Sequence, residues 1–175
     1  MFRKRRQKAK TLRVVGPSSA GSGRGPRIAK PACATVYLAA EAPLRLIEWR
    51  DEMPGFFVAD LETKNDELVR VQFAKPYVYF AGSHTHCGCG FNYGRISNFE
   101  RDPEELARKH HSLAAMSEYL IHEIGRVGEI ELFVCWDGDQ AAAPEIRRNL
   151  TPRSLLGERF FFYEGELSVV RDDAA

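Results

Sequence analysis

Two cysteines and two histidines lie within a glycine-rich segment that runs from Gly82 to Gly94. The segment reads Gly-Ser-His-Thr-His-Cys-Gly-Cys-Gly-Phe-Asn-Tyr-Gly and holds half of the four cysteines of the chain. Thiolates and imidazoles bind soft and borderline metal ions, and thiolates are also nucleophiles. Glycine allows the sharp backbone turns that gather such side chains. The segment therefore predicts a metal- or thiol-dependent site in a small protein.

The first hypothesis is a metal site built from His84, His86, Cys87 and Cys89. These donors suit zinc or iron, and copper(I) as well. The spacing is not that of a zinc finger, because it contains no pair of cysteines separated by two residues. In an extended chain the two histidines face one side and the two cysteines the other. We therefore expect both cysteines and one histidine to bind one ion, with Asp137 or water as the last ligand.

The second hypothesis is thiol chemistry in the Cys87-Gly88-Cys89 motif. A disulfide within this motif closes a small strained ring and is easily reduced. Alternatively, Cys87 is a catalytic nucleophile, with His84 as its base and Asp137 orienting the imidazole.

Two further interpretations remain open for the same segment. Its glycines and Ser83 can turn backbone N–H groups toward a small anionic ligand, although neither a Walker motif nor a dinucleotide-binding glycine motif is present. Arg147, Arg148 and Arg153 are candidates to attract such an anion. In the last interpretation the protein is a non-catalytic binding or adaptor module, and the glycine loop is structural.

The other thiols and histidines are weaker candidates. Cys135 lies in an apolar strand pattern, which predicts a buried packing residue. Cys33 falls at the end of the predicted N-terminal tail. His111, Glu118 and His122 share one side of a predicted helix, opposite its apolar stripe, and we expect them to face solvent.

The best-specified element is a helix over residues 103–127. Asp102 is the predicted N-cap, Pro103 occupies the first helical position, and Glu105 completes a capping box. Gly128 is expected to end the helix.

Short apolar or alternating segments predict strands around this helix, over residues 35–40, 56–62, 67–73, 77–81, 129–136 and 159–171. Residues 63–66 are the predicted turn of a hairpin, residues 140–149 a polar link that is helical from Pro144, and residues 151–156 a capped short helix. Together these elements predict a single α+β domain over residues 34–172, with a mixed, mostly antiparallel sheet and the long helix packed on one face.

One predicted β-α-β crossover, over residues 77–136, connects the candidate site to a second loop. A helix between two strands usually joins strands that run in the same direction, so both strands end at one edge of the sheet. We therefore expect the Cys/His loop to share that edge with Trp136-Asp137-Gly138-Asp139.

The charge of the chain is divided unevenly. Residues 1–33 contain ten Lys or Arg and no Asp or Glu, which leaves 25 − 10 = 15 basic against 24 acidic residues, a net charge of about −9, in residues 34–175. The composition of residues 1–33 predicts a disordered basic tail, which is interpreted as a nucleic-acid or anionic-surface arm, a transit peptide or a dispensable extension. Nucleic acid is expected to bind only through this tail. No apolar run is long enough to span a membrane, and the cytoplasm is the expected location.

Overall fold

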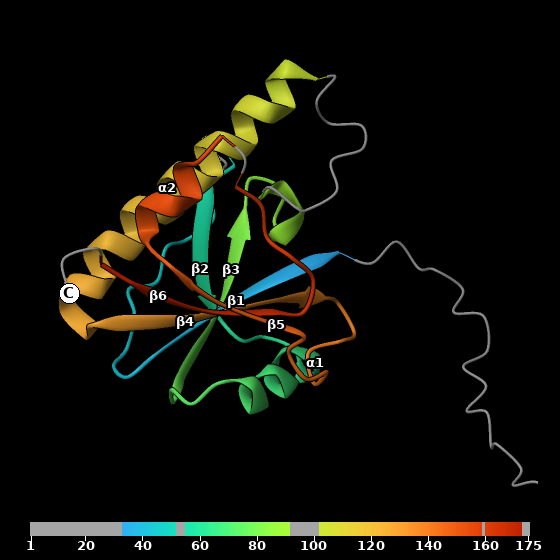
Figure 1. Ribbon diagram of the computed structural model, residues 1–175. Coiled ribbons are helices and arrows are strands. Elements are labelled where there is room, and N and C mark those ends of the chain that lie inside the picture. Colours follow the sequence, from blue (N-terminus) through green and yellow to red (C-terminus); the bar gives the residue numbers. More distant parts are fainter. Residues whose placement is uncertain (1–32, 52–54, 92–101, 159, 173–175) are drawn as a thin grey trace, which may run out of the picture. The chain divides into compact units, whose positions relative to one another are not determined.

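The computed structural model describes residues 33–51, 55–91, 102–158 and 160–172, and it confirms the predicted α+β sheet with one long helix. Six strands form one sheet in the order β2-β3-β1-β4-β6-β5 (Figure 1). Neighbouring strands are antiparallel, except that β5 and β6 are parallel. The strands are β1 Ala34–Ala40, β2 Phe56–Asp60, β3 Tyr77–Ser83, β4 Glu129–Trp136, β5 Ile146–Leu150 and β6 Glu166–Arg171. Residues 1–32 of the predicted tail lie outside the described residues, whereas its last residue, Cys33, is described.

Strand β1 runs through the middle of the sheet, and all seven of its residues are buried. Successive side chains of a strand point to opposite faces. Val36 and Leu38 therefore join the larger apolar cluster on one face, while Tyr37 and Ala39 join a smaller cluster on the other. Both faces of the sheet are covered, which explains why this strand is a continuous apolar run.

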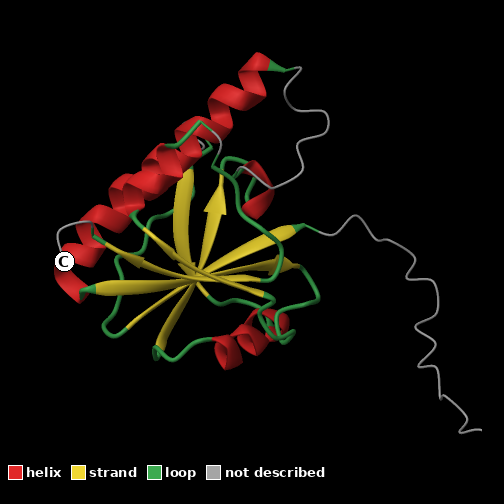
Figure 2. Cartoon of the chain, viewed as in Figure 1, coloured by secondary structure: helices red, strands yellow, loops and turns green. Residues whose placement is uncertain are grey.

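Helix α2, Pro103–Val127, packs against the face with the larger cluster (Figure 2). The Asp102 side chain accepts hydrogen bonds from the backbone N–H groups of Glu104 and Glu105, and Gly128 ends the helix at φ 85°. The predicted helix, its N-cap and its terminating glycine are therefore confirmed. The predicted capping box is wrong, because the Glu105 carboxylate contacts His84 and Arg108 and does not accept from the backbone N–H of Asp102.

The predicted strand over residues 67–73 is wrong. The chain forms α1 Lys64–Glu67 and the 3₁₀ helix η1 Leu68–Gln72 on the sheet face opposite α2 (Figure 1). Thr63 and Asp66 form a reciprocal capping box, which starts a helix where the hairpin turn was predicted. Of the alternating valines only Val69 is buried, whereas the side chain of Val71 is exposed.

The segment predicted to be a polar link also differs from expectation. It contains β5, which pairs with β6 as the edge strand of the sheet. Arg148 of β5 forms an ion pair with the fully buried Glu166 of β6, and this pair accounts for an arginine in a half-buried strand. The short capped helix that follows is confirmed as the 3₁₀ helix η4, Pro152–Leu156, with Thr151 as its N-cap.

The predicted crossover from β3 through α2 to β4 is present, but its two strands are not neighbours. Both pair antiparallel with β1, which lies between them, so β3 and β4 run in the same direction. The ends of β3 and β4 and the start of β1 consequently meet at one edge of the sheet. Among the described residues, no helix is both long enough and apolar enough to cross a lipid bilayer.

Candidate thiolate metal centre

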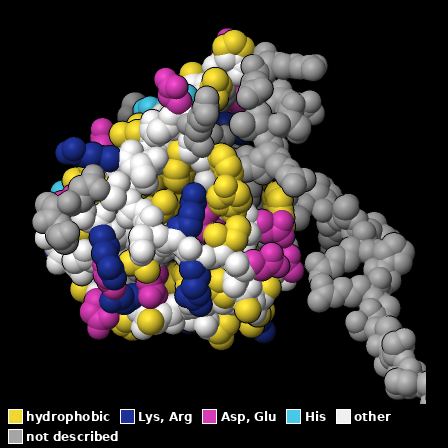
Figure 3. Space-filling view, in the orientation of Figure 1, with side chains coloured by type: hydrophobic (Ala, Val, Ile, Leu, Met, Phe, Trp, Pro, Cys, Tyr) yellow, Lys and Arg dark blue, Asp and Glu magenta, His cyan; other side chains and the backbone are white. Residues whose placement is uncertain are grey.

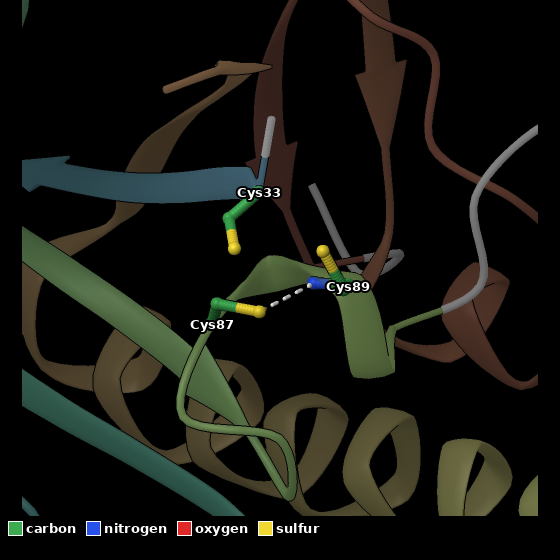
Figure 4. A group of neighbouring side chains, drawn as sticks. All are labelled: Cys33, Cys87 and Cys89. Atoms are coloured by element: carbon green, nitrogen blue, oxygen red, sulfur yellow. Dashed lines mark hydrogen bonds between the residues drawn. The ribbon is translucent and has the colours of Figure 1, made fainter. Parts of the chain in front are cut away.

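Three cysteine sulfurs meet at this edge of the sheet. The Sγ atoms of Cys33, Cys87 and Cys89 all lie within 4.8 Å of one another. Cys33 directly precedes β1, whereas Cys87 and Cys89 belong to the loop after β3, and Figure 4 shows their side chains grouped around one small space. All three are free thiols. Three thiols from two distant parts of the chain are therefore close enough to bind one metal ion or to form a disulfide with one another.

Strand pairing holds the start of β1 in place. Ala34 faces Trp136 of β4, and the Asp137 backbone N–H donates to the Cys33 carbonyl at 2.8 Å. The Ala34 N–H donates to the sulfur of Cys89 at 3.1 Å. The first residue of the central strand is thus bonded to both flanking segments, which brings Cys33 beside the loop.

The loop that carries Cys87 and Cys89 folds back on the end of β3. The Ser83 N–H donates to the Cys87 carbonyl at 3.0 Å, and the Ser83 hydroxyl donates to the same oxygen at 2.6 Å. His86 takes a left-handed conformation, with φ 63°, where the chain reverses. The 3₁₀ turn η2, Gly88–Gly90, then leads into the buried Phe91.

Two glycines of η2 permit the close approach of this loop to its neighbours. A Cβ atom on Gly88 would lie 2.8 Å from the Ala34 carbonyl oxygen, and one on Gly90 would lie 2.2 Å from the Ser83 hydroxyl oxygen. Both distances are shorter than any ordinary contact. Gly88 and Gly90 are therefore the positions at which the lack of a side chain lets the loop pack closely enough to bring the cysteines together.

The three thiols differ in their acidity. Hydrogen bonds from the Cys89 thiol, the Thr85 hydroxyl and the Cys89 backbone N–H lower the pKa of Cys87 to about 5. The pKa of Cys89 is raised, because its thiol donates to Cys87 and is partly buried. The charge on Cys87, followed by burial, raises the pKa of Cys33. In the metal-free protein one negative charge is therefore centred on Cys87 and solvated by its neighbours.

His84 connects the loop to α2. Its Nδ1 lies 2.9 Å from the Ser112 hydroxyl oxygen, and its Nε2 lies 3.3 Å from the Glu105 carboxylate. The Ser112 hydroxyl donates its single proton to the Gly55 carbonyl at 2.7 Å, so Nδ1 of His84 must be the donor to Ser112. Both ring nitrogens thus face residues of α2, Ser112 and Glu105.

His86 and Asp137, the other predicted site residues, also have defined partners. The exposed His86 ring packs on Trp49 with a centroid separation of 3.6 Å. The Asp137 carboxylate accepts from the Asn65 amide at 2.9 Å and the Gln140 amide at 3.1 Å. Asp137 therefore lies at the same edge of the sheet as the cysteines, as the topology predicted. Its contact with Cys33 is the backbone hydrogen bond, and its carboxylate is bonded to Asn65 and Gln140.

Among the described residues, the one group of His, Cys, Asp or Glu side chains close enough to hold a metal ion is Cys33, Cys87 and Cys89. Sequence reasoning missed Cys33, because it lies 54 positions before Cys87 and next to the basic tail. The available clue was its place directly before an apolar strand. Cys135, by contrast, is buried and contacts the Thr35 hydroxyl, in agreement with the predicted packing role.

Comparisons of the chain with protein-family models, curated protein sequences and solved structures give no match.

Proposed function

We propose that Cys33, Cys87 and Cys89 bind one thiophilic metal ion, with zinc as the leading candidate. The observation that carries this proposal is the mutual separation of the three sulfurs, at most 4.8 Å. Tetrahedral zinc with Zn–S bonds of about 2.3 Å places its sulfurs about 3.8 Å apart. The side chains therefore need to close by about 1 Å or less, a movement that side-chain rotation supplies.

Hydrogen bonds to the sulfurs support the same assignment. Backbone N–H groups of Ala34 and Cys89 point at the sulfurs of Cys89 and Cys87. The second of these bonds is drawn in Figure 4. Such donors orient thiolate ligands and reduce the repulsion between several sulfur anions around one ion. A loop that only filled space would not need backbone donors aimed at two sulfurs.

The ligand set differs from the one first predicted, with Cys33 in place of a histidine. His84 and His86 remain nearby in the chain, but their rings are engaged with Ser112, Glu105 and Trp49. Three protein ligands leave the fourth position of a tetrahedral ion for water or a small ligand. This arrangement is the one that catalytic zinc sites use, whereas structural sites use four protein ligands.

Cobalt(II) substitution tests the proposal. Cobalt(II) bound by thiolates gives sulfur-to-metal charge-transfer absorption that grows with the number of sulfurs. We expect a tetrahedral cobalt spectrum in the native chain and a stepwise loss of charge-transfer intensity in the variants Cys33→Ser, Cys87→Ser and Cys89→Ser. The variant Cys135→Ser is the matched control, because that thiol is outside the cluster and should leave the spectrum unchanged.

A second candidate function is thiol–disulfide exchange, favoured by the same distances and by the low pKa of Cys87. In this function Cys87 attacks a low-molecular-weight disulfide, releases one thiolate and forms a mixed disulfide. Cys33 or Cys89 then attacks Cys87, releases the second thiolate and leaves an intramolecular disulfide, so that two electrons pass to the oxidant. In this function His84 holds the loop of Cys87 against Ser112 of α2, and the Asp137 backbone N–H holds Cys33 through its carbonyl oxygen. Both are therefore positioning residues. Incubation with oxidised glutathione, followed by intact-mass measurement, distinguishes this function from metal binding.

A further inference from the structure

A groove of about 650 Å³ lies beside α2, and its lining contains none of the three clustered cysteines. It is lined by the segment Arg45–Arg50, by Gly55 and Phe56 at the start of β2, and by His111 and Ala115 of α2. Ile47 forms an isolated bridge to Val58 of β2, which fixes this segment against the sheet edge. The size is within the range of about 300–1,000 Å³ typical of small-molecule sites.

The groove is lined by two exposed arginines, Arg45 and Arg50, and by one exposed carboxylate, that of Glu48. Arg70, Arg108, Arg126, Arg148 and Arg171 all pair with carboxylates. Figure 3 shows the same tendency, with basic and acidic side chains adjacent on the face in view. Arg45 and Arg50 are exposed and form no ion pair with any residue in the part of the chain that the structure describes. Two guanidinium groups against the single carboxylate of Glu48 give this groove an excess of positive charge, in a domain with an excess of acidic residues, and this favours an anionic ligand.

The aromatic lining residues indicate that this ligand also has a flat apolar part. Trp49 and Phe56 are half-buried aromatic side chains, and Ile47 packs against the core beneath them. The imidazole of His111 lies close to Gly55, where a Cβ atom would come within 3.2 Å of its Nε2. An aromatic ring stacked on an indole or a guanidinium plane is stabilised by its burial and by its π-system.

From these observations we infer that the groove binds a small phosphate ester that carries a planar ring, of the nucleoside-monophosphate class. Arg45 and Arg50 bind the phosphate, since guanidinium groups donate two parallel hydrogen bonds to phosphate oxygens. Trp49 contacts the ring. The same Trp49 packs on His86, the residue before Cys87, so the groove and the cysteine loop share one aromatic contact. This site does not depend on the proposed metal.

The test uses the full chain and three probes, which are adenosine 5′-monophosphate, adenosine and inorganic phosphate, each titrated by calorimetry. We expect the monophosphate to bind most tightly, because it alone engages both parts of the groove. Arg45→Ala and Arg50→Ala should each weaken its binding about tenfold, the loss expected for one charged hydrogen-bonding group. The matched control is Arg147→Ala, which removes the same charge from an exposed arginine of β5 and should leave binding unchanged.

Four outcomes would overturn this inference. The monophosphate could bind no more tightly than inorganic phosphate, which would mean that the aromatic side chains make no contact. Arg147→Ala could weaken binding as much as the groove variants, which would indicate a general charge effect. A single-stranded oligonucleotide could bind far more tightly than the monophosphate, which would indicate a nucleic-acid surface. Loss of binding in Cys87→Ser alone would instead connect the ligand to the metal site.

Discussion

The backbone N–H of Ala34 donates a hydrogen bond to the sulfur of Cys89 at 3.1 Å, across 55 positions of the chain. This contact joins the first residue of the central strand to the loop after β3. Because β1 is hydrogen-bonded along both of its sides, the position of Ala34 is set by the whole sheet. The cysteine cluster is therefore held by the fold, and changes that separate these two segments should abolish it.

Gly88→Ala should separate them. The added methyl group would meet the Ala34 carbonyl at 2.8 Å and a Val36 methyl group at 3.1 Å. Overpacking of this kind costs about 1–3 kcal/mol, and it would push Cys89 away from Cys33. We expect a lower free energy of unfolding and a loss of bound metal, measured by chemical denaturation and elemental analysis.

Gly125→Ala in α2 is the control for that variant. A Cβ atom at Gly125 meets nothing within 4 Å, and alanine is about 0.5–1 kcal/mol better than glycine inside a helix. It should therefore be neutral or stabilising with full metal content. A Gly88→Ala protein as stable and as metal-loaded as Gly125→Ala would contradict the packing described for η2.

Alkylation of the metal-free protein should depend on pH in a manner set by Cys87. Hydrogen bonds from Cys89 and Thr85 lower the pKa of Cys87 to about 5, so its thiolate persists at neutral pH and is lost only as the pH falls through that value. Cys33 and Cys89, whose pKa values are raised, should react mainly in alkaline solution. Peptide mapping after iodoacetamide treatment measures each rate. An alkylation rate of Cys87 that continued to rise through pH 8 would show that its pKa is not lowered.

Replacement of the histidines separates the two predicted ligand sets. His86→Ala should retain stoichiometric metal, because its ring packs on Trp49 outside the group of three sulfurs. His84→Gln should also retain metal while lowering stability, since the ring bridges the loop to Ser112 and Glu105. Metal content that fell to zero in either variant while the fold was intact, as judged by circular dichroism, would restore a histidine to the coordination sphere.

Arg148→Ala should be among the most destabilising substitutions on β5. Its guanidinium pairs with the carboxylate of Glu166, whose side chain is 0% exposed. Removal of Arg148 leaves the buried carboxylate without its counter-ion, with the Tyr163 N–H and the Ser168 hydroxyl as its remaining donors, at a cost of about 3 kcal/mol. Arg147→Ala on the same strand removes an exposed side chain and should change stability by less than about 0.5 kcal/mol. Equal effects of the two changes on urea denaturation would be inconsistent with the buried pair.

The sequence predicts the elements whose signals are local and mutually consistent. Helix α2 begins at an aspartate cap with proline in the first turn and ends at a glycine, and the structure confirms each of these features. The segment after β2 shows the opposite case. The alternation of Val69, Val71 and Phe73 predicts a strand, but the Thr63–Asp66 capping box decides the local conformation and produces α1 and η1.

The candidate site was predictable in part for a physical reason. Cys87 and Cys89 stand out because only one residue, Gly88, separates them and Gly90 follows. Cys33 joins them only through the antiparallel pairing of β1 with β3 and β4, a long-range arrangement that no local pattern encodes. The helix between β3 and β4 correctly predicted that these strands run in the same direction. It did not predict that β1 lies between them.

The central claim is that three sulfurs bind one metal ion, and the zinc content of the Cys33→Ser protein tests it most directly. The native chain and the Cys135→Ser control, each purified without an affinity tag and reconstituted with zinc, should contain one zinc ion per chain after gel filtration. Cys33→Ser should contain much less than one while remaining folded. Zinc bound at full stoichiometry by Cys33→Ser, or absent from the reconstituted native chain, would contradict the account.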